Sequence, residues 1–173
     1  MVLAVIDSDV LIHLAKLNQL DLLKVQFSQI FISEIIYNET VVQGINTKRK
    51  DAQILQDFIK TDFIQVEEIS RQKTIEIMGK YNIHKGESSI IALAEKNQVD
   101  YCITNEIKVR NTIKSEGFKV VGTLGIILKA FNLNKIDKKL CLKLLKHLKS
   151  EPKEFRFHPK LISRVKKEVN RKK

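Results

Sequence analysis

The sequence has little cysteine, proline or glycine, and it has no tryptophan. Its two cysteines, Cys102 and Cys141, are far apart and match no metal-binding spacing, so we expect neither a disulfide framework nor a zinc site. We interpret both as reduced, buried side chains. Two prolines and six glycines leave little room for long irregular loops. These absences favour one globular domain of ordinary size, built from regular elements.

Long apolar runs are absent as well. The least polar stretch, VVGTLGIIL, is too short to cross a bilayer. The first ten residues, MVLAVIDSDV, lack a basic region and contain two acids, so they do not resemble a secretory signal. We therefore expect a soluble protein of the cytoplasm.

Charged residues are unevenly distributed along the chain, whose net charge is +11. Residues 1–134 contain 16 lysines and arginines against 16 acids, whereas residues 135–173 contain 15 against 4. This basic C-terminal segment predicts an anionic partner. Nucleic acid is the first candidate, and a membrane surface is weaker because the basic helices lack tryptophan. A solvated helical surface that binds nothing is the alternative.

Short apolar segments alternate with segments of helical periodicity, which is typical of an α/β fold with a mainly parallel sheet. We expect strands at residues 2–7, 29–33, 62–69, 100–104 and 118–122, the third at an edge. Helices are expected between them, including 33–42 and 85–97, with a polar loop at 43–50. Two basic amphipathic helices, 137–149 and 158–170, follow. The charge shift predicts a domain at 1–134 and a helical extension, 135–173, packed on it.

Four acidic residues are expected to meet at one edge of this sheet. Asp7 ends the first strand and Glu106 closely follows the fourth, and parallel α/β sheets bind ligands at the carboxyl ends of their strands. Two further acids lie within the apolar stripes of helices and are expected to point inward. The stripes consist of Ile35, Ile36, Glu39 and Val42 in one helix and Glu87, Ile90, Ile91 and Ala94 in the other.

Converging carboxylates repel one another unless protons or cations neutralise them. Oxygen ligands without histidine or cysteine suit Mg²⁺ or Mn²⁺, and two such ions can activate a water for phosphodiester cleavage. Each acid also has a simpler interpretation. Asp7 can cap a helix and Glu39 can pair with a lysine, while Glu87 and Glu106 can face a helix dipole. The joint pattern favours a metal site over four separate explanations.

Segments of the chain resemble the PIN-domain family in order and spacing: VIDSDVLIHLAKLNQLDLL, ISEIIYNET, HKGESSIIALA, and ITNEIKVR with FKVVGTLGIILKA. The resemblance runs from residue 2 to about residue 131 and is nearest to a subgroup related to the toxin ribonucleases of toxin–antitoxin pairs. It implies a three-layer α/β/α sandwich with a mainly parallel sheet, plus C-terminal basic helices. It also implies a metal-dependent endoribonuclease that hydrolyses phosphodiester bonds with Mg²⁺ or Mn²⁺.

The resemblance also implies roles for individual residues. Asp9 matches a position close to the metal, and Asn105 stands where the subgroup often has an acid, which predicts a weaker second metal site. An alternative alignment, with a threonine two residues before the acid, fits Thr104 and Glu106 directly. Arg110 matches a frequent arginine and, with Lys108, is expected to bind nucleic-acid phosphate. The catalytic and metal-binding acids, carried over by position, are Asp7, Glu39, Glu87 and Glu106.

RNA, in single-stranded form, is the expected substrate. The resemblance further implies a homodimer and a small antitoxin protein as partner. The alternative is a nucleic-acid-binding protein with weak or no catalysis, which Asn105 and the basic C-terminal segment both favour.

Overall fold

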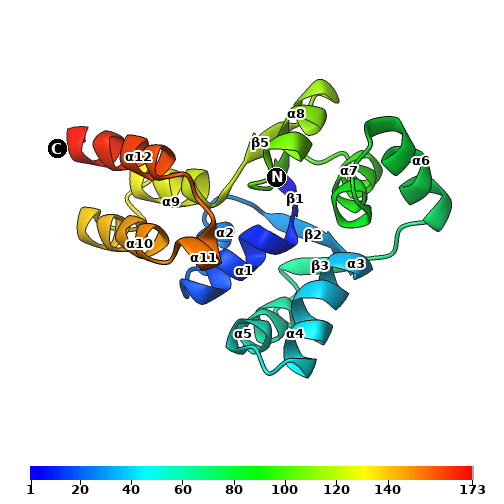
Figure 1. Cartoon of the computed structure of the whole chain (residues 1–173), viewed down its shortest axis with the longest axis horizontal. Helices are drawn as coiled ribbons and strands as arrows, with labels where there is room; N and C mark the ends of the chain where they lie inside the picture. Colours follow the sequence, from blue (N-terminus) through cyan, green and yellow to red (C-terminus); the bar gives the residue numbers. More distant parts are fainter. Residues whose placement is uncertain (173) are drawn as a thin grey trace. The chain divides into compact units, whose positions relative to one another are not determined.

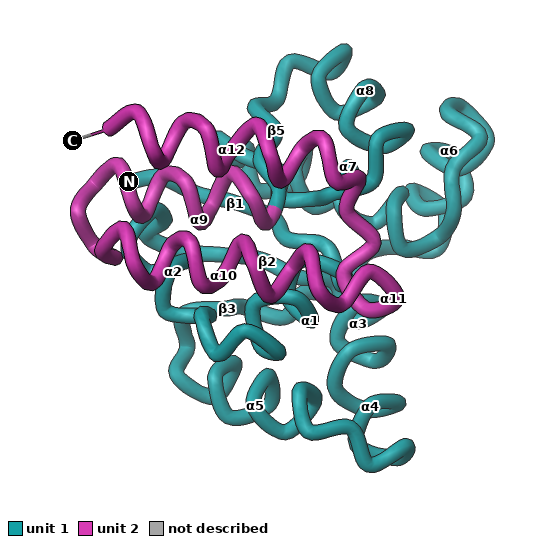
Figure 2. The backbone as a smooth tube through the Cα atoms, turned by 60° about the vertical axis from the view of Figure 1, so that its left-hand side comes forward, with its two compact units in different colours: residues 1–122 teal, residues 123–173 magenta. Residues whose placement is uncertain are grey.

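The computed structural model describes residues 1–172. The chain forms two compact units, Met1–Gly122 (unit 1) and Thr123–Lys173 (unit 2), shown in different colours in Figure 2. Unit 1 contains a sheet with its covering helices, whereas the described part of unit 2 is helical. The two cysteines, Cys102 in unit 1 and Cys141 in unit 2, are free and buried, as predicted.

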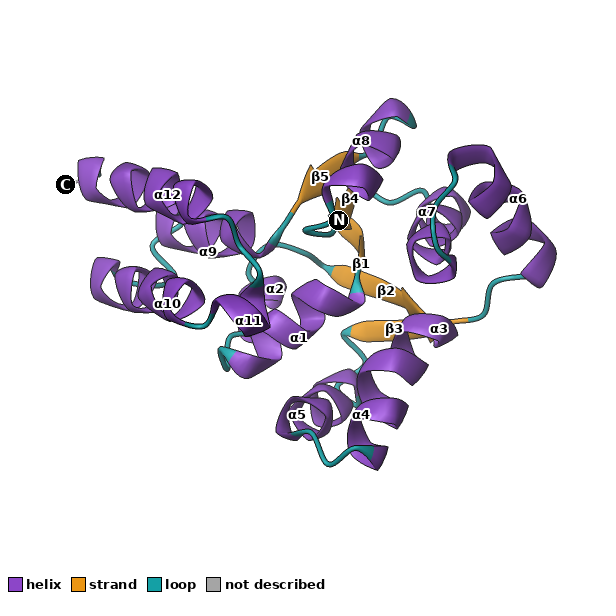
Figure 3. Cartoon of the chain, viewed as in Figure 1, coloured by secondary structure: helices purple, strands orange, loops and turns teal. Residues whose placement is uncertain are grey.

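Unit 1 is built around a sheet of five parallel strands in the order β3-β2-β1-β4-β5 (Figure 3). Central strand β1 buries Ala4, Val5 and Ile6 completely, because neighbouring elements cover both of its faces. The predicted parallel sheet is therefore confirmed, and so is the edge position of β3. The strands are β1 (Leu3–Ile6), β2 (Gln29–Ser33), β3 (Ile64–Glu67), β4 (Tyr101–Ile103) and β5 (Lys119–Val121).

Helices cover both faces of this sheet, which gives the three-layer arrangement (Figure 1). Since parallel crossovers are right-handed, helices after β1 and β2 lie on one face and those after β3 and β4 on the other. The elements on the first face are α1 (Ser8–Lys16), α2 (Asp21–Lys24), α3 (Glu34–Tyr37), the π-helical turn η1 (Asn38–Val42), α4 (Gln43–Asn46) and α5 (Lys50–Ile59). Those on the second are α6 (Arg71–Tyr81), α7 (Lys85–Asn97) and α8 (Ile107–Ser115).

Helix α7 packs across strands β1, β2 and β4. Its residues Ile90, Ile91 and Ala94 are fully buried, as their helical spacing predicts. A hydrogen bond 2.8 Å long between the hydroxyls of Ser33 and Ser89 joins the end of β2 to this helix. Packing and this buried polar contact together fix the first turn of α7 near the carboxyl ends of the strands.

The helical segment after β2 contains one wide turn. It begins as predicted at Ser33, whose hydroxyl accepts a hydrogen bond from the backbone N–H of Ile36 (3.2 Å). It then passes into η1, where the N–H of Gln43 bonds to the carbonyl of Asn38, five residues earlier. A π-helical turn inserts one extra residue into the helix and so rotates every side chain that follows.

Ile36, before this turn, is fully buried as expected, but the rotation overturns the part of the inward stripe that includes Glu39 and Val42. Thr40 and Val41 are buried in its place, while Val42 is 40% exposed and Glu39 is exposed. The sequence pattern assumes a uniform period of 3.6 residues, which a π-helical turn breaks. Glu39 therefore lies on the water-accessible side of the helix rather than beneath it.

The polar loop expected at residues 43–50 is wrong for its first half, because Gln43–Asn46 continues the helix as α4. Close packing against α5 supports this turn. A Cβ atom placed on Gly44 would be only 2.5 Å from the Cβ of Ala52. Glycine at position 44 therefore allows the two backbones to approach, and the contact holds a segment whose composition is typical of a loop.

Unit 2 consists of four helices that share an apolar interior. Helix α9 contacts both α10 and α12, which also contact each other. The leucine side of α10 is buried at Leu144, Leu145 and Leu148, and α12 buries Ile162 and Val169. Both predicted basic helices are thus confirmed. The helices are α9 (Thr123–Asn132), α10 (Lys138–Ser150), α11 (Pro152–Phe155) and α12 (Pro159–Arg171).

Lysine side chains form hydrogen bonds between the ends of unit 2 helices. The Lys138 ammonium donates to the carbonyl of Asn170 (3.4 Å), and that of Lys172 donates to the carbonyl of Asn132 (2.9 Å). These bonds satisfy carbonyl groups at helix C-termini. Across residues 1–172, no helix is long and apolar enough to cross a membrane.

Two glycines in helices of unit 1, Gly44 in α4 and Gly79 in α6, give opposite predictions for replacement by alanine. Gly44→Ala should lower the free energy of unfolding by about 1–3 kcal/mol, because the new Cβ overlaps Ala52. Gly79→Ala is the matched control, since a Cβ there meets nothing within 4 Å and α6 gains helix propensity worth about 0.5–1 kcal/mol. Urea unfolding of the two variants measures the difference. Equal stability of both would contradict the close α4–α5 contact.

Candidate active site

Asp7 lies directly after β1, where the chain enters α1. Its Oδ1 accepts a hydrogen bond from the N–H of Ser8 (2.7 Å), and its Oδ2 accepts one from the hydroxyl of Thr104 (2.8 Å). Thr104 follows β4 and is itself fully buried. The backbone continues the link, since the N–H of Asp7 donates to the carbonyl of Ile103 (2.9 Å). The ends of two neighbouring strands are thereby joined through one carboxylate.

This position is the topological switch point of the sheet. The chain leaves β1 toward β2 on one side and later returns to place β4 on the other. The helices that follow β1 and β4 lie on opposite faces, so their first turns diverge around Asp7. Open α/β sheets bind ligands at such a point.

Burial raises the pKa of the Asp7 carboxyl group to about 6 from its ordinary value of 3.8. Repulsion from the nearby Asp9 contributes to this rise in pKa, whereas the hydrogen bonds from Thr104 and Ser8 oppose it. The side chain is only 9% exposed. Asp7 is therefore ionised near neutral pH only at a cost in stability.

Asp9, in the first turn of α1, is a second carboxylate whose charge is unfavourably buried. Its Oδ2 accepts a hydrogen bond from the Asn105 side-chain amide (2.9 Å), but its Oδ1 is buried without a hydrogen-bond partner among residues 1–172. Burial is the main cause of its raised pKa, and Glu106 adds repulsion. An unpaired buried carboxylate oxygen beside a second buried carboxylate is what a cation would satisfy.

Asn105 and His13 form a polar contact, of which the sequence analysis identified only Asn105. The side-chain nitrogen of Asn105 is 3.3 Å from Nδ1 of His13, which is buried on α1 one turn after Asp9. The spacing of Asp9 and His13 by four residues was the available signal, since such residues share a helix face. An acid in place of Asn105 would lose the amide donor and repel Asp9, so the amide here supports the carboxylate.

The Asn105 side chain also explains the glycine at the end of β5. A Cβ on Gly122 would be 2.5 Å from Oδ1 of Asn105 and 3.2 Å from the Thr104 carbonyl. A larger residue at position 122 would displace the amide that Asp9 uses. Gly122 thus supports the site only by leaving room for the Asn105 side chain.

Glu39 is exposed but lies beside the same carboxylates. Partial burial is the main cause of its raised pKa, Asp7 adds repulsion, and Lys85 opposes the shift. A Cβ on Gly86 would be 3.7 and 3.8 Å from its two carboxylate oxygens. Glu39 therefore faces the first turn of α7, whose N-terminal dipole favours negative charge.

Glu87 and Glu106 are placed differently from Asp7 and Glu39. The Glu87 carboxylate accepts a hydrogen bond from the backbone N–H of His84 (2.7 Å), so it caps α7 within its own first turn. Glu106 is exposed at the start of α8, close enough to Asp9 to raise the pKa of that residue. The structure thus gathers Asp7, Asp9 and Glu39, with Glu106 beside Asp9, while Glu87 is turned toward the helix backbone.

The two cations expected to bind phosphate hold backbone carbonyls. The Arg110 guanidinium donates to the carbonyl of Thr104 (2.8 Å), and its burial lowers its pKa. The Lys108 ammonium is exposed and donates to the carbonyl of Asn82 (2.5 Å). Arg110 therefore braces the turn that carries Thr104, whereas Lys108 keeps its head group at the surface.

Comparison with known proteins decides the family. A family model described as a PIN domain matches residues 3–171. The chain belongs to the PIN-domain family. No curated protein matches the sequence.

Two solved structures share the PIN-domain fold of this chain. A toxin–antitoxin complex from Klebsiella pneumoniae matches with a TM-score of 0.52 and 20% identity, over 68% of this chain and 95% of that one. The crystal structure of PAE2754 from Pyrobaculum aerophilum matches with a TM-score of 0.51 and 13% identity, over 83% of this chain and 96% of that one. At such identities the likeness concerns the fold alone.

PIN domains are generally nucleases that use divalent metals. Within residues 1–172 of this PIN domain, no three His, Cys, Asp or Glu side chains lie close enough together to hold a metal ion. The donor chemistry nevertheless fits a hard divalent cation, because the gathered groups are carboxylates and one buried oxygen of Asp9 is unpaired.

Asp7→Asn should stabilise the fold at neutral pH. The pKa of Asp7 is about 6 in the folded protein, against an ordinary value of 3.8 for the unfolded chain. Protonated Asp7 therefore contributes its full stability below pH 3.8, and this contribution is lost as the pH rises through 6. The penalty in the wild type at pH 8 is about 3 kcal/mol by linkage, and asparagine removes it while keeping an acceptor for Ser8.

Urea unfolding from pH 4 to pH 8 measures this effect. The variant should be more stable by about 1–3 kcal/mol at pH 8, with the difference vanishing near pH 4. Asp57→Asn is the control, because Asp57 is an exposed carboxylate paired with Lys60 on α5. A difference that persists unchanged at pH 4 would mean that burial of the Asp7 charge is not its cause.

Proposed function

We propose that this protein is a metal-dependent endoribonuclease that hydrolyses phosphodiester bonds. The observation that carries the proposal is the set of carboxylates around the switch point. Asp7 is repelled by Asp9 and repels Glu39, and burial raises the pKa of all three. A purely structural site has no reason to keep three repelling acids. A site that binds a cation does.

Mg²⁺ or Mn²⁺ is the proposed cofactor. Asp7, Asp9 and Glu39 would hold it, with Glu106 at the exposed side and Glu87 joining once its side chain turns away from the His84 amide. Such a metal lowers the pKa of a bound water and stabilises the leaving oxygen of the phosphodiester.

The remaining groups orient these acids. Thr104 and Ser8 hold the two oxygens of the Asp7 carboxylate, one each. The Asn105 amide donates a hydrogen bond to one oxygen of Asp9, and the other oxygen is the proposed metal ligand. Arg110 fixes the turn that contains Thr104. Lys108, exposed at the start of α8, is the cation proposed to meet substrate phosphate.

Single-stranded RNA is the proposed substrate, supported by the resemblance to toxin ribonucleases and by the basic charge of the chain. A small antitoxin-like protein is a proposed partner, supported by the fold shared with a chain of a toxin–antitoxin complex. The homodimer implied by the family resemblance stays a prediction. Light scattering on the purified protein would test it.

A second candidate function is nucleic-acid binding without turnover. Two observations favour it: the described residues gather no complete ligand set, and an amide replaces the acid common at position 105. Binding would then depend on phosphate contacts and weaken steeply with salt. The two candidates differ in whether the phosphodiester bond is cut.

Cleavage of a mixed-sequence single-stranded RNA tests the nuclease proposal. The wild type should cut the RNA with Mn²⁺ or Mg²⁺ and not with EDTA. Asp7→Asn should reduce the rate by at least about 100-fold because it removes a ligand charge from the metal. Asp57→Asn, outside the site, should cut as the wild type does. Metal-independent cleavage, or full activity of Asp7→Asn, would refute the assignment.

Metal binding has a readout that does not require the right RNA. Mn²⁺ at about 100 times its Kd should stabilise the wild type by about 2.7 kcal/mol, because it binds only the folded state. Asp7→Asn and Asp9→Asn should lose most of this gain, whereas Asp57→Asn should keep it. Thermal unfolding with and without metal measures the shift. An equal shift in all four proteins would show that the metal binds elsewhere.

A further inference from the structure

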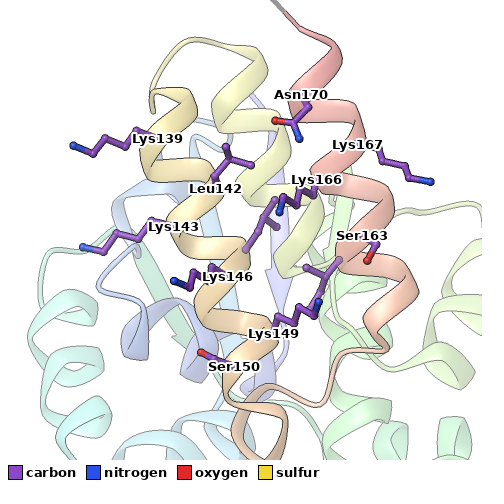
Figure 4. A pocket seen from close by; sticks show the side chains of 12 residues that line it. Lys139, Leu142, Lys143, Lys146, Lys149, Ser150, Ser163, Lys166, Lys167 and Asn170 are labelled. Carbon is purple, nitrogen blue, oxygen red and sulfur yellow. The ribbon is translucent and has the colours of Figure 1, made fainter.

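Unit 2 contains a groove between α10 and α12 that the nuclease proposal does not use. It has a volume of about 940 Å³ and lies wholly within residues 139–170 (Figure 4). Helix α9 contacts both groove helices. Because every residue that lines it belongs to unit 2, the groove is independent of the carboxylate site in unit 1.

The floor of the groove is apolar. Leu142 is half-buried at its centre, and Leu145 and Ile162 lie deeper, with exposed fractions of 1% and 3%. The aliphatic stems of the flanking lysines extend this apolar surface, as long basic side chains commonly do. The described lining residues include no aromatic side chain on which a nucleic-acid base could stack.

The rim of the groove is strongly basic. Figure 4 shows lysines on both sides, with Lys149 and Lys166 extending into the space between the helices. No acidic side chain is among the described lining residues, although unit 2 contains four acids. The six rim lysines are Lys139, Lys143, Lys146, Lys149, Lys166 and Lys167.

Floor and rim together select one kind of occupant. A nucleic-acid backbone would use the lysines but leave the apolar floor without a partner, and single strands usually add aromatic stacking. An amphipathic helix with one apolar and one acidic face would use both, in the helix-in-groove mode of recognition. A second copy of this chain does not match, because none of the described helices contains more than two acids.

We propose that the groove between α10 and α12 binds an acidic amphipathic helix of a partner protein. The apolar face of that helix covers Leu142 above Leu145 and Ile162. Its carboxylates meet the lysines of both groove helices, which sets the orientation of the partner and speeds its association. The six rim lysines are thus assigned to a protein partner.

A designed peptide provides the probe. It is about 20 residues long, with leucine at helical spacing on one face and glutamate on the other, long enough to form a helix. A scrambled peptide of the same composition keeps the charge but loses the apolar face, and a single-stranded RNA of similar charge represents the other class of ligand. Fluorescence anisotropy with the full chain measures binding of each.

The amphipathic peptide should bind at roughly micromolar Kd, and the scrambled peptide at least about ten-fold more weakly. Leu142→Gln should weaken the amphipathic peptide by roughly ten-fold and leave RNA binding unchanged. The double variant Lys149→Glu, Lys166→Glu, which reverses the two lysines that extend between the helices, should weaken the peptide by more than about ten-fold. Its matched control, Lys153→Glu, Lys160→Glu, reverses two lysines outside the groove and should change binding by less than about three-fold.

Three results would overturn the proposal. Equal binding of the amphipathic and scrambled peptides would reduce the effect to net charge. Loss of affinity in both double variants to the same extent would do likewise. RNA that binds more tightly than the peptide and displaces it would make the groove a nucleic-acid surface. The exposed lysine variants keep the test valid if Leu142→Gln fails to fold.

Discussion

The hydrogen bond from the Thr104 hydroxyl to Asp7 connects the ends of β1 and β4, and the candidate site is organised around it. A parallel sheet whose chain turns back at its central strand leaves a gap between two diverging helices at that point. Asp7 fills the gap with a charged group, which is an expensive choice in a buried position. Ser8, Thr104 and the β4 backbone offset part of this cost. Every other acid of the site is placed relative to this one.

The acids differ in how they tolerate one another. Asp9 depends on the Asn105 amide, and this explains why an amide at position 105 suits the site. Glu39 uses the dipole of α7 and the nearby Lys85. The Glu87 carboxylate caps the N-terminus of α7. Hydrogen-bond donors, the N-terminal end of a helix and separation in space thus each reduce part of the repulsion between the acids. Such compensation allows the protein to fold without a bound cation.

The two units use charge in opposite ways. Residues 1–122 contain 15 basic and 16 acidic residues, so unit 1 is nearly neutral, but it places several of its acids at the carboxyl edge of the sheet. Residues 123–173 contain 16 basic and 4 acidic residues, and unit 2 directs part of that excess to the rim of a single groove. A negative site and a positive groove on separate units can recognise different ligands. The former suits a cation with a phosphodiester, and the latter an acidic helix.

The sequence by itself determined the parallel sheet, the edge position of β3, the buried stripe of α7, the two basic helices and the family. These follow from local periodicity, composition and short ordered motifs, which depend only on neighbouring residues. It also pointed to Asp7 and Glu106 from their positions at strand ends. Tertiary structure alone decided the register of η1, the helical start of the expected loop and the partners of Asn105. It also decided the capping role of Glu87 and the groove between α10 and α12. These features depend on contacts through space, such as Gly44 against Ala52 and Asn105 against His13, which no local pattern encodes.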